Sequence, residues 1–297
     1  MNVKIFKNKF SESIELNQKL AKFTWFGVGG NTEILFIPEN EEALIDFLKN
    51  KPQEYKVTVI GAGSNLLIRD KGIDGIILIT KKLKKITIDN DGVISAQAGA
   101  TDAEVARFAR NHERTGLEFL LGIPGTIGGG IKMNSGAFGS EFKDILIDVK
   151  AINHSGELKV FSIKELEMGY RKIGVNNEWI FFTARFKSSS DNKENIESKM
   201  KQIIDFRKKA QPTGVKTGGS TFKNPKGLKA WELIDQAGCR GLKVGDAKIS
   251  EKHCNFIINL KNSSAQQIED LGEKVKLKVF ETSGIRLNWE IHRVGKK

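Results

Sequence analysis

The chain has few cysteines, no long apolar run and no histidine cluster. Its only two cysteines, Cys239 and Cys254, are too few for a disulfide framework and form no CxxC pair. We therefore expect two reduced thiols and no bound metal. No stretch of about 18 apolar residues is present, so the sequence predicts no membrane-spanning helix. Residues 1–9 contain lysines but lack the apolar segment of a signal peptide. This argues against secretion and predicts a cytoplasmic protein.

Acidic residues are outnumbered, with 36 Asp and Glu against 48 Lys and Arg and a net charge of +12. A basic RNA-binding protein is one hypothesis that this charge allows. However, the basic residues are spread along the chain, and no basic run is interleaved with aromatic residues. We therefore expect no nucleic-acid partner. The positive charge instead favours small anionic ligands such as phosphates.

Strand and helix patterns alternate through the first part of the chain. Residues 32–38 and 57–60 have strand character, and residues 41–48 have apolar residues at helical spacing. Short strands follow at 76–79, 86–88 and 93–97. A capping box at Thr101–Glu104 then predicts a helix that ends near Gly116.

The later part of the chain combines strands with two longer helices. Strands are expected at 145–151 and 180–186, and the polar residues 188–193 are a candidate linker. Helices are expected at 194–209 and after a second capping box at Ser263–Gln266, the latter ending at Gly284. The sequence thus predicts an α+β protein with three regions. Their boundaries are 1–80, 81–190 and 191–297.

A dense glycine segment lies near the centre of the chain. Residues 122–130 hold five glycines in nine positions. Glycine lets the backbone approach a ligand closely, and exposed N–H groups can then bind a diphosphate. The alternative interpretation of these glycines is a set of tight turns. Common nucleotide motifs fit poorly. Ile131 and Lys132 stand where a P-loop needs Lys-Ser/Thr, and Leu66 replaces the third glycine of a dinucleotide fingerprint at Gly61–Gly63.

Seven motifs occur in the order found in one known family. They are Phe26-Gly27-Val28-Gly29-Gly30, Gly61-Ala62-Gly63-Ser64-Asn65-Leu66-Leu67, residues 122–129, Asn134-Ser135-Gly136-Ala137, Gly169-Tyr170-Arg171, residues 219–225 and Leu287-Asn288-Trp289-Glu290-Ile291. From about residue 20 to residue 294 the chain resembles the UDP-N-acetylenolpyruvoylglucosamine reductases, flavoenzymes of peptidoglycan precursor synthesis. The resemblance implies a two-part FAD-binding module of the vanillyl-alcohol-oxidase type (residues 1–80 and 81–190). A substrate domain follows at 191–297, with a C-terminal tail that returns to the FAD side.

The resemblance also implies the cofactor and the reaction. FAD would be bound without a covalent link and reduced by NADPH. The reduced flavin would then reduce the enolpyruvyl ether of UDP-N-acetylglucosamine to UDP-N-acetylmuramate. The residues that match FAD-binding positions are Gly29, Gly30, Gly61, Ala62, Gly63, Ser64, Asn65, Leu66, Gly122, Pro124, Gly125, Thr126, Gly128, Gly129, Asn134, Gly136 and Ala137.

Three residues match the family's catalytic positions. Ser220 corresponds to the proton donor, Arg171 to an arginine that polarises the substrate carboxylate, and Glu290 to a carboxylate near the reacting centre. Asn288 departs from the family pattern, which has an acidic residue there. Candidate substrate-binding residues are Arg207, Tyr170 and Lys223.

Tyrosine is scarce, with Tyr55 and Tyr170 the only two. The longer members of the family carry a tyrosine-bearing loop after the Tyr-Arg motif, so this chain resembles the shorter type that lacks this loop. We expect a monomer. A sugar or alcohol oxidase on the same FAD fold is the alternative enzyme, although the glycine-rich segments offer no histidine or cysteine for covalent flavin attachment.

Overall fold

The computed structural model describes residues 3–297, and these form two compact units, each built from three segments of the chain. The first unit contains residues 3–16, Ile34–Ala62 and Gly75–Arg207, and the second contains Asn17–Glu33, Gly63–Asp74 and Lys208–Lys297. These segments do not coincide with the three regions expected at 1–80, 81–190 and 191–297. That functional division stays a prediction.

An aromatic core fills the N-terminal part of the first unit. Helix α1 (Val3–Lys9) contributes Phe6, and helix α2 (Glu41–Asn50) contributes Phe47, whose ring stacks on Phe36 with centroids 3.7 Å apart. The associated sheet has the order β1-β2-β5-β3. Its strands are β1 (Ile14–Lys19), β2 (Asn31–Phe36), β5 (Ile73–Ile79) and β3 (Val57–Ile60). Strands β3 and β5 are parallel.

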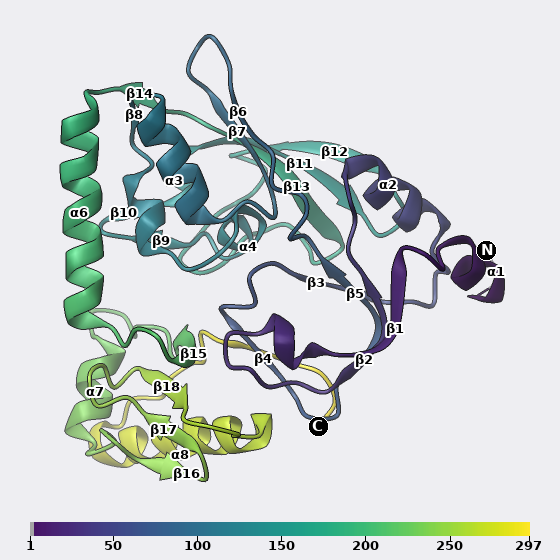
Figure 1. The fold of residues 1–297 in the computed structure, drawn as a ribbon. Helices are drawn as coiled ribbons and strands as arrows, with labels where there is room; N and C mark the ends of the chain where they lie inside the picture. Colours follow the sequence, from purple (N-terminus) through teal and green to yellow (C-terminus); the bar gives the residue numbers. More distant parts are fainter. Residues whose placement is uncertain (1–2) are drawn as a thin grey trace. The chain divides into compact units, whose positions relative to one another are not determined.

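A five-stranded sheet lies in the later part of the first unit (Figure 1). Its order is β12-β11-β13-β7-β6, and its strands are β6 (Ile86–Ile88), β7 (Ile94–Gln97), β11 (Leu146–Asn153), β12 (Leu158–Ser162) and β13 (Trp179–Phe186). All of its neighbouring strands are antiparallel. Buried residues of the sheet pack with helix α3 (Asp102–Asn111) and helix α4 (Ile127–Lys132).

The capping box at Thr101 is present, but helix α3 is shorter than expected. Thr101 accepts a hydrogen bond from the Glu104 amide, and the Glu104 carboxylate accepts one from the Thr101 amide. The helix ends at Asn111 rather than near Gly116, because Glu113 adopts a φ of 54°. Strand β8 (Arg114–Thr115) then leads to the 3-10 helix η2 (Glu118–Gly122).

The expected linker at 188–193 is ordered. Ser189 and Ser190 form strand β14, which pairs with β8. The Arg114 guanidinium donates hydrogen bonds to the Ser188 carbonyl at 2.8 Å and to the Ser190 hydroxyl at 2.7 Å. A polar composition does not reveal such a distant partner. Helix α6 (Lys193–Ala210) follows at the expected place.

Helix α8 and a four-stranded sheet form the core of the second unit (Figure 1). The sheet order is β15-β18-β17-β16, all antiparallel, with β15 (Lys216–Ser220), β16 (Lys243–Val244), β17 (Ala247–Ile249) and β18 (Phe256–Asn259). Helix α7 (Ala230–Gln236) and helix α8 (Ala265–Ser283) bury apolar residues in the same core. Cys239 and Cys254 are free and buried there.

The ends of helix α8 are capped by polar residues and by glycine. The N-cap is Ser264 with Gln267 as its partner, one residue later than the capping box expected at Ser263. The helix ends as expected at Gly284, which has a left-handed φ of 71°. Strand β19 (His292–Val294) then pairs in parallel with strand β4 (Leu66–Ile68). Within residues 3–297, no helix combines the length and the apolar character needed to cross a membrane.

Candidate active site

Ser220 and Glu290 lie on adjoining segments of the second unit. Ser220 ends strand β15 after an irregularity in its pairing with β18, and Gly219 before it has a φ of 77°. The Glu290 amide donates a hydrogen bond of 2.8 Å to the carbonyl of Thr221, the residue that follows Ser220. The structure thus brings together two residues that are 70 positions apart in the sequence.

The buried side chain of Asn255 holds this pair of segments in place. It accepts a hydrogen bond from the Phe222 amide at 2.9 Å and donates one to the Phe222 carbonyl at 2.8 Å. The Asn255 carbonyl accepts a third bond, from the Thr221 amide at 2.7 Å. The Phe222 ring packs on Trp289 with centroids 5.2 Å apart. Thr221, which follows Ser220, and Trp289, which precedes Glu290, are therefore held in place.

Asn65 from the glycine loop joins the same cluster. Its side chain donates a hydrogen bond of 3.2 Å to the Glu290 carbonyl, and its own carbonyl accepts one of 3.0 Å from the His292 amide. The parallel pair of β4 and β19 continues this contact. Lys223 belongs to the same segments, because its amide donates a hydrogen bond of 2.8 Å to the Asn288 carbonyl. The predicted residues Asn65, Ser220, Lys223 and Glu290 thus lie on one hydrogen-bonded frame. This frame consists of residues 65, 220–223, 255 and 288–292.

In the first unit, the glycine-rich loop is fixed against residues 98–102. The Asp102 amide donates to the Gly125 carbonyl at 3.2 Å, and the Ile127 amide donates to the Ala100 carbonyl at 2.9 Å. A Cβ atom at Gly61 would lie 2.3 Å from the Thr126 hydroxyl oxygen. One at Gly128 would lie 2.9 Å from the Ala98 side chain. Close packing therefore accounts for part of the glycine content.

Polar groups of this loop and of the adjoining residues Gly61 and Ala62 suit a cofactor that is rich in hydrogen-bond acceptors. The amides of Gly61, Ala62, Gly125 and Thr126 donate to no acceptor in residues 3–297. The buried Thr126 hydroxyl also makes no hydrogen bond within the described chain. Thr126 is buried, whereas Gly61, Ala62 and Gly125 are partly exposed. A buried polar group needs a partner, and a phosphoryl or carbonyl oxygen of FAD would provide it. The residues present therefore fit the cofactor.

Asp102 is a further buried polar residue beside this loop. It is fully buried, and neither of its carboxylate oxygens makes a hydrogen bond within the described residues. A Cβ atom at Gly125 would lie 2.7 Å from one of these oxygens. Burial raises the pKa of the Asp102 carboxyl well above its ordinary value, so the neutral acid is favoured. From the sequence, Asp102 is expected only as a residue of the first turn of a helix, and its burial is not evident.

Asn134 and Arg171 connect two turns of the first unit. The fully buried Asn134 donates hydrogen bonds to the Glu141 carboxylate at 3.0 Å and the Gly169 carbonyl at 3.1 Å. Arg171, with a φ of 53°, donates to the carbonyls of Asn134 at 3.4 Å and Gly136 at 3.3 Å. Its guanidinium carbon lies 5.0 Å from the centre of the Tyr170 ring.

Arg207 contacts the start of the glycine-rich loop. Its guanidinium donates a hydrogen bond of 3.2 Å to the Leu121 carbonyl, beside Gly122. Burial lowers the pKa of this guanidinium, although an arginine remains charged at neutral pH. The first unit thus brings Arg207, Gly122, Gly136 and Arg171 into one connected set of contacts.

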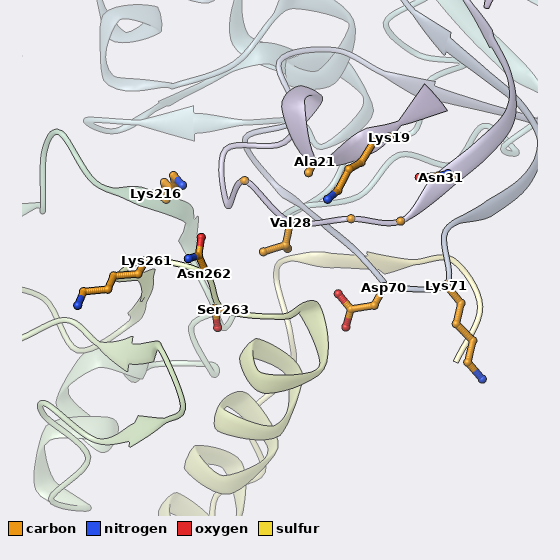
Figure 2. Close-up of a pocket in the computed structure, with 13 residues that line it drawn as sticks. Lys19, Ala21, Val28, Asn31, Asp70, Lys71, Lys216, Lys261, Asn262 and Ser263 are labelled. Atoms are coloured by element: carbon orange, nitrogen blue, oxygen red, sulfur yellow. The ribbon is translucent and has the colours of Figure 1, made fainter. Parts of the chain in front are cut away.

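A basic cavity of about 670 Å³ lies in the second unit (Figure 2). Gly29 and Gly30 line it, as do Lys19, Lys71, Lys216 and Lys261. The one acidic residue in the lining is Asp70, whose carboxylate accepts hydrogen bonds from the Ala265 and Gln266 amides at the start of α8. Its lysines favour anionic groups. Ser220 and Glu290 are not among its lining residues.

Comparison with known proteins agrees with this organisation. Residues 211–294 match the family model of the UDP-N-acetylenolpyruvoylglucosamine reductase C-terminal domain, and residues 32–162 match that of an FAD binding domain. A reductase of that name from Paramagnetospirillum magneticum is 48% identical over 277 residues, covering 93% of this chain and 90% of the relative. One from Rickettsia bellii is 45% identical over 297 residues, covering 100% and 97%. The chain belongs to the UDP-N-acetylenolpyruvoylglucosamine reductase family.

A solved structure of a member of this family supports the fold. The enzyme from Thermus caldophilus is 34% identical, covers 94% of this chain and 98% of its own, and has a TM-score of 0.82. The α+β prediction is thereby confirmed, with an FAD-binding domain over residues 32–162 and the reductase C-terminal domain over residues 211–294.

The individual roles of the reductase residues stay predictions. The structure places them in two sets, one in each unit. Asn255 and Asp102 were not expected in the site from sequence. Asn255 acts through contacts with residues more than 30 positions away, which no local pattern indicates.

Proposed function

We propose that this chain reduces the enolpyruvyl ether of UDP-N-acetylglucosamine to UDP-N-acetylmuramate, with FAD as cofactor and NADPH as reductant. This reaction serves peptidoglycan precursor synthesis, and we place the protein in the cytoplasm as a monomer. The observation that carries the proposal is the frame that holds Ser220 beside Glu290, in the region that matches the reductase C-terminal domain.

The residues that match the family's FAD-binding positions would hold the cofactor. In the first unit these are Gly61, Ala62, Gly122, Pro124, Gly125, Thr126, Gly128, Gly129, Asn134, Gly136 and Ala137. In the second they are Gly29, Gly30, Gly63, Ser64, Asn65 and Leu66. The unpaired amides and the buried Thr126 hydroxyl support this assignment. When bound, FAD supplies the hydride chemistry, which side chains cannot perform.

Ser220 would deliver the proton from its hydroxyl to the substrate carbon next to the carboxylate. A serine hydroxyl is a weak acid, so the site must stabilise the alkoxide that remains. The fixed backbone on both sides of Ser220 suits this task, because a group held in place needs little rearrangement during proton transfer. Glu290 would stabilise or protonate the enol form of the substrate.

Arg171 would bind the substrate carboxylate with its planar guanidinium, which can donate two parallel hydrogen bonds. Its contacts with the carbonyls of Asn134 and Gly136 orient the side chain for this role. Arg207, Tyr170 and Lys223 would also bind the substrate. Arg207 would bind a phosphate or carboxylate group of the substrate, and Lys223 would help to balance charge at Ser220.

A sugar or alcohol oxidase on the same fold is less well supported. The three relatives named above each match more than nine-tenths of this chain and carry the reductase name. Oxygen consumption with sugar alcohols in the absence of NADPH would favour the oxidase instead.

The visible spectrum of the purified protein tests the proposed function. We expect a yellow protein with a flavin spectrum that NADPH bleaches without oxygen. The enolpyruvyl substrate should then restore the oxidised spectrum. A colourless protein that cannot be reconstituted with FAD would contradict the proposal.

A further inference from the structure

Phe138 occupies a turn position that suits it poorly. Strands β9 (Gly136–Ala137) and β10 (Ser140–Glu141) form a hairpin in which Ala137 pairs with Ser140. The two turn residues, Phe138 and Gly139, have φ values of 53° and 84°. Positive φ at both positions is typical of a type I′ turn, which strongly prefers Asn-Gly or Gly-Gly. A bulky residue with positive φ is strained.

Packing in the described structure does not account for a phenylalanine here. Phe138 is 47% exposed, and its ring contacts Phe206 of α6, which is 58% exposed, at 5.4 Å and 81°. The ring also lies against Gly122, where a Cβ atom would be only 2.7 Å from it. Two rings that remain this exposed bury little apolar surface between them. The strain at Phe138 therefore indicates a role outside folding.

Two guanidinium groups of the first unit contact backbone carbonyls on segments that adjoin this aromatic pair. Arg171 donates to the carbonyl of Gly136, two residues before Phe138. Arg207 follows Phe206 directly and donates to the carbonyl of Leu121, next to Gly122. An exposed aromatic surface with neighbouring cations is the combination that binds a planar base with anionic groups attached.

We propose that Phe138 and Phe206 form a binding surface for the heterocyclic ring of a nucleotide, whose anionic groups lie toward Arg171 and Arg207. The inference rests on the proposed function, whose two soluble ligands, NADPH and the UDP-sugar, both combine such a ring with phosphates. Phe138 is then a positioning residue, and its strained turn presents the ring to the ligand.

Three variants separate ligand binding from stability. Phe138→Asn removes the ring and installs the residue that a type I′ turn prefers. Phe138→Leu removes the flat ring but keeps an apolar side chain and the strain. Phe206→Leu removes the second ring. Phe280→Leu is the matched control, since Phe280 on α8 is also exposed, at 39%, and lies 4.5 Å from the Arg286 guanidinium in the second unit.

Isothermal titration of the FAD-loaded variants with UDP and with NADP⁺ is the experiment, together with melting temperatures. Both Phe138 variants should bind at least one of these probes at least about 5-fold more weakly, the lower end of the effect of losing a stacking ring. The probe that weakens identifies the ligand. Phe138→Asn should melt about 2–4 °C higher than wild type, and Phe138→Leu should not. Phe280→Leu should match wild type in binding.

Unchanged affinity for both UDP and NADP⁺ in the two Phe138 variants would overturn the inference. So would weaker FAD retention with normal affinity for both probes, because the ring would then serve the cofactor. A wild-type protein that binds no FAD would contradict the proposed function instead, and the UDP titration can still be performed on that protein.

Discussion

Ser220 is the residue on which the proposed chemistry depends most directly. Removing its hydroxyl by Ser220→Ala should leave reduction of the flavin by NADPH close to normal. Reoxidation of the flavin by the enolpyruvyl substrate should slow by a factor of about 10² or more, because proton delivery is lost. Stopped-flow absorbance resolves the two half-reactions. Equal losses in both would show that Ser220 serves binding rather than proton transfer.

Arg171 differs from a simple positive charge because of its shape. Arg171→Lys keeps the charge but cannot donate two parallel hydrogen bonds to a carboxylate, so it should recover only part of the rate lost in Arg171→Ala. The measurement is the rate of flavin reoxidation at saturating substrate. Lys172→Ala, at the neighbouring position, is the control and should retain the wild-type rate. Full activity in Arg171→Lys would contradict bidentate recognition.

At the scale of elements, the glycines of α4 offer a matched pair of variants. A Cβ atom at Gly130 would lie 2.3 Å from the buried Phe142 ring, whereas one at Gly129 has its nearest neighbour at 3.7 Å. Gly130→Ala should therefore lower the free energy of unfolding by about 1–3 kcal/mol through overpacking. Gly129→Ala should fold normally and weaken FAD binding, as measured by flavin fluorescence. Wild-type FAD affinity in Gly129→Ala would remove that residue from the proposed cofactor site.

The frame around Ser220 is a second element whose stability can be measured. Asn255→Ala leaves the Phe222 amide and carbonyl buried without partners, which should cost about 2–4 kcal/mol in the free energy of unfolding. Asn176→Ala, at an exposed position, should change it by less than about 0.5 kcal/mol. Urea denaturation compares the two. A small effect at Asn255 would mean that the frame does not depend on its side chain.

Local patterns in the sequence predicted elements better than contacts between them. The strand at 57–60 and the end of α8 at Gly284 follow from apolar runs and glycine, and both are confirmed. The N-cap of α8 was misplaced by one residue because Ser263 and Ser264 are equally able to cap. Strand β14 was missed because its partner, β8, lies over 70 positions away. The proximity of Ser220 to Glu290 has the same origin and came only from the resemblance.

For the molecule as a whole, the buried Asp102 predicts how stability depends on pH. Its pKa is raised in the folded state because of burial, so the folded protein keeps a proton that the unfolded chain releases. Stability should therefore fall as pH rises from the ordinary pKa of an aspartate toward the raised value in the fold. Asp102→Asn removes this titration and should raise the melting temperature more at pH 8 than at pH 4. Asp205→Asn, the same substitution at an exposed position on α6, is the control and should show no such difference. If Asp102→Asn shifts the melting temperature equally at both pH values, then Asp102 does not remain neutral in the folded protein.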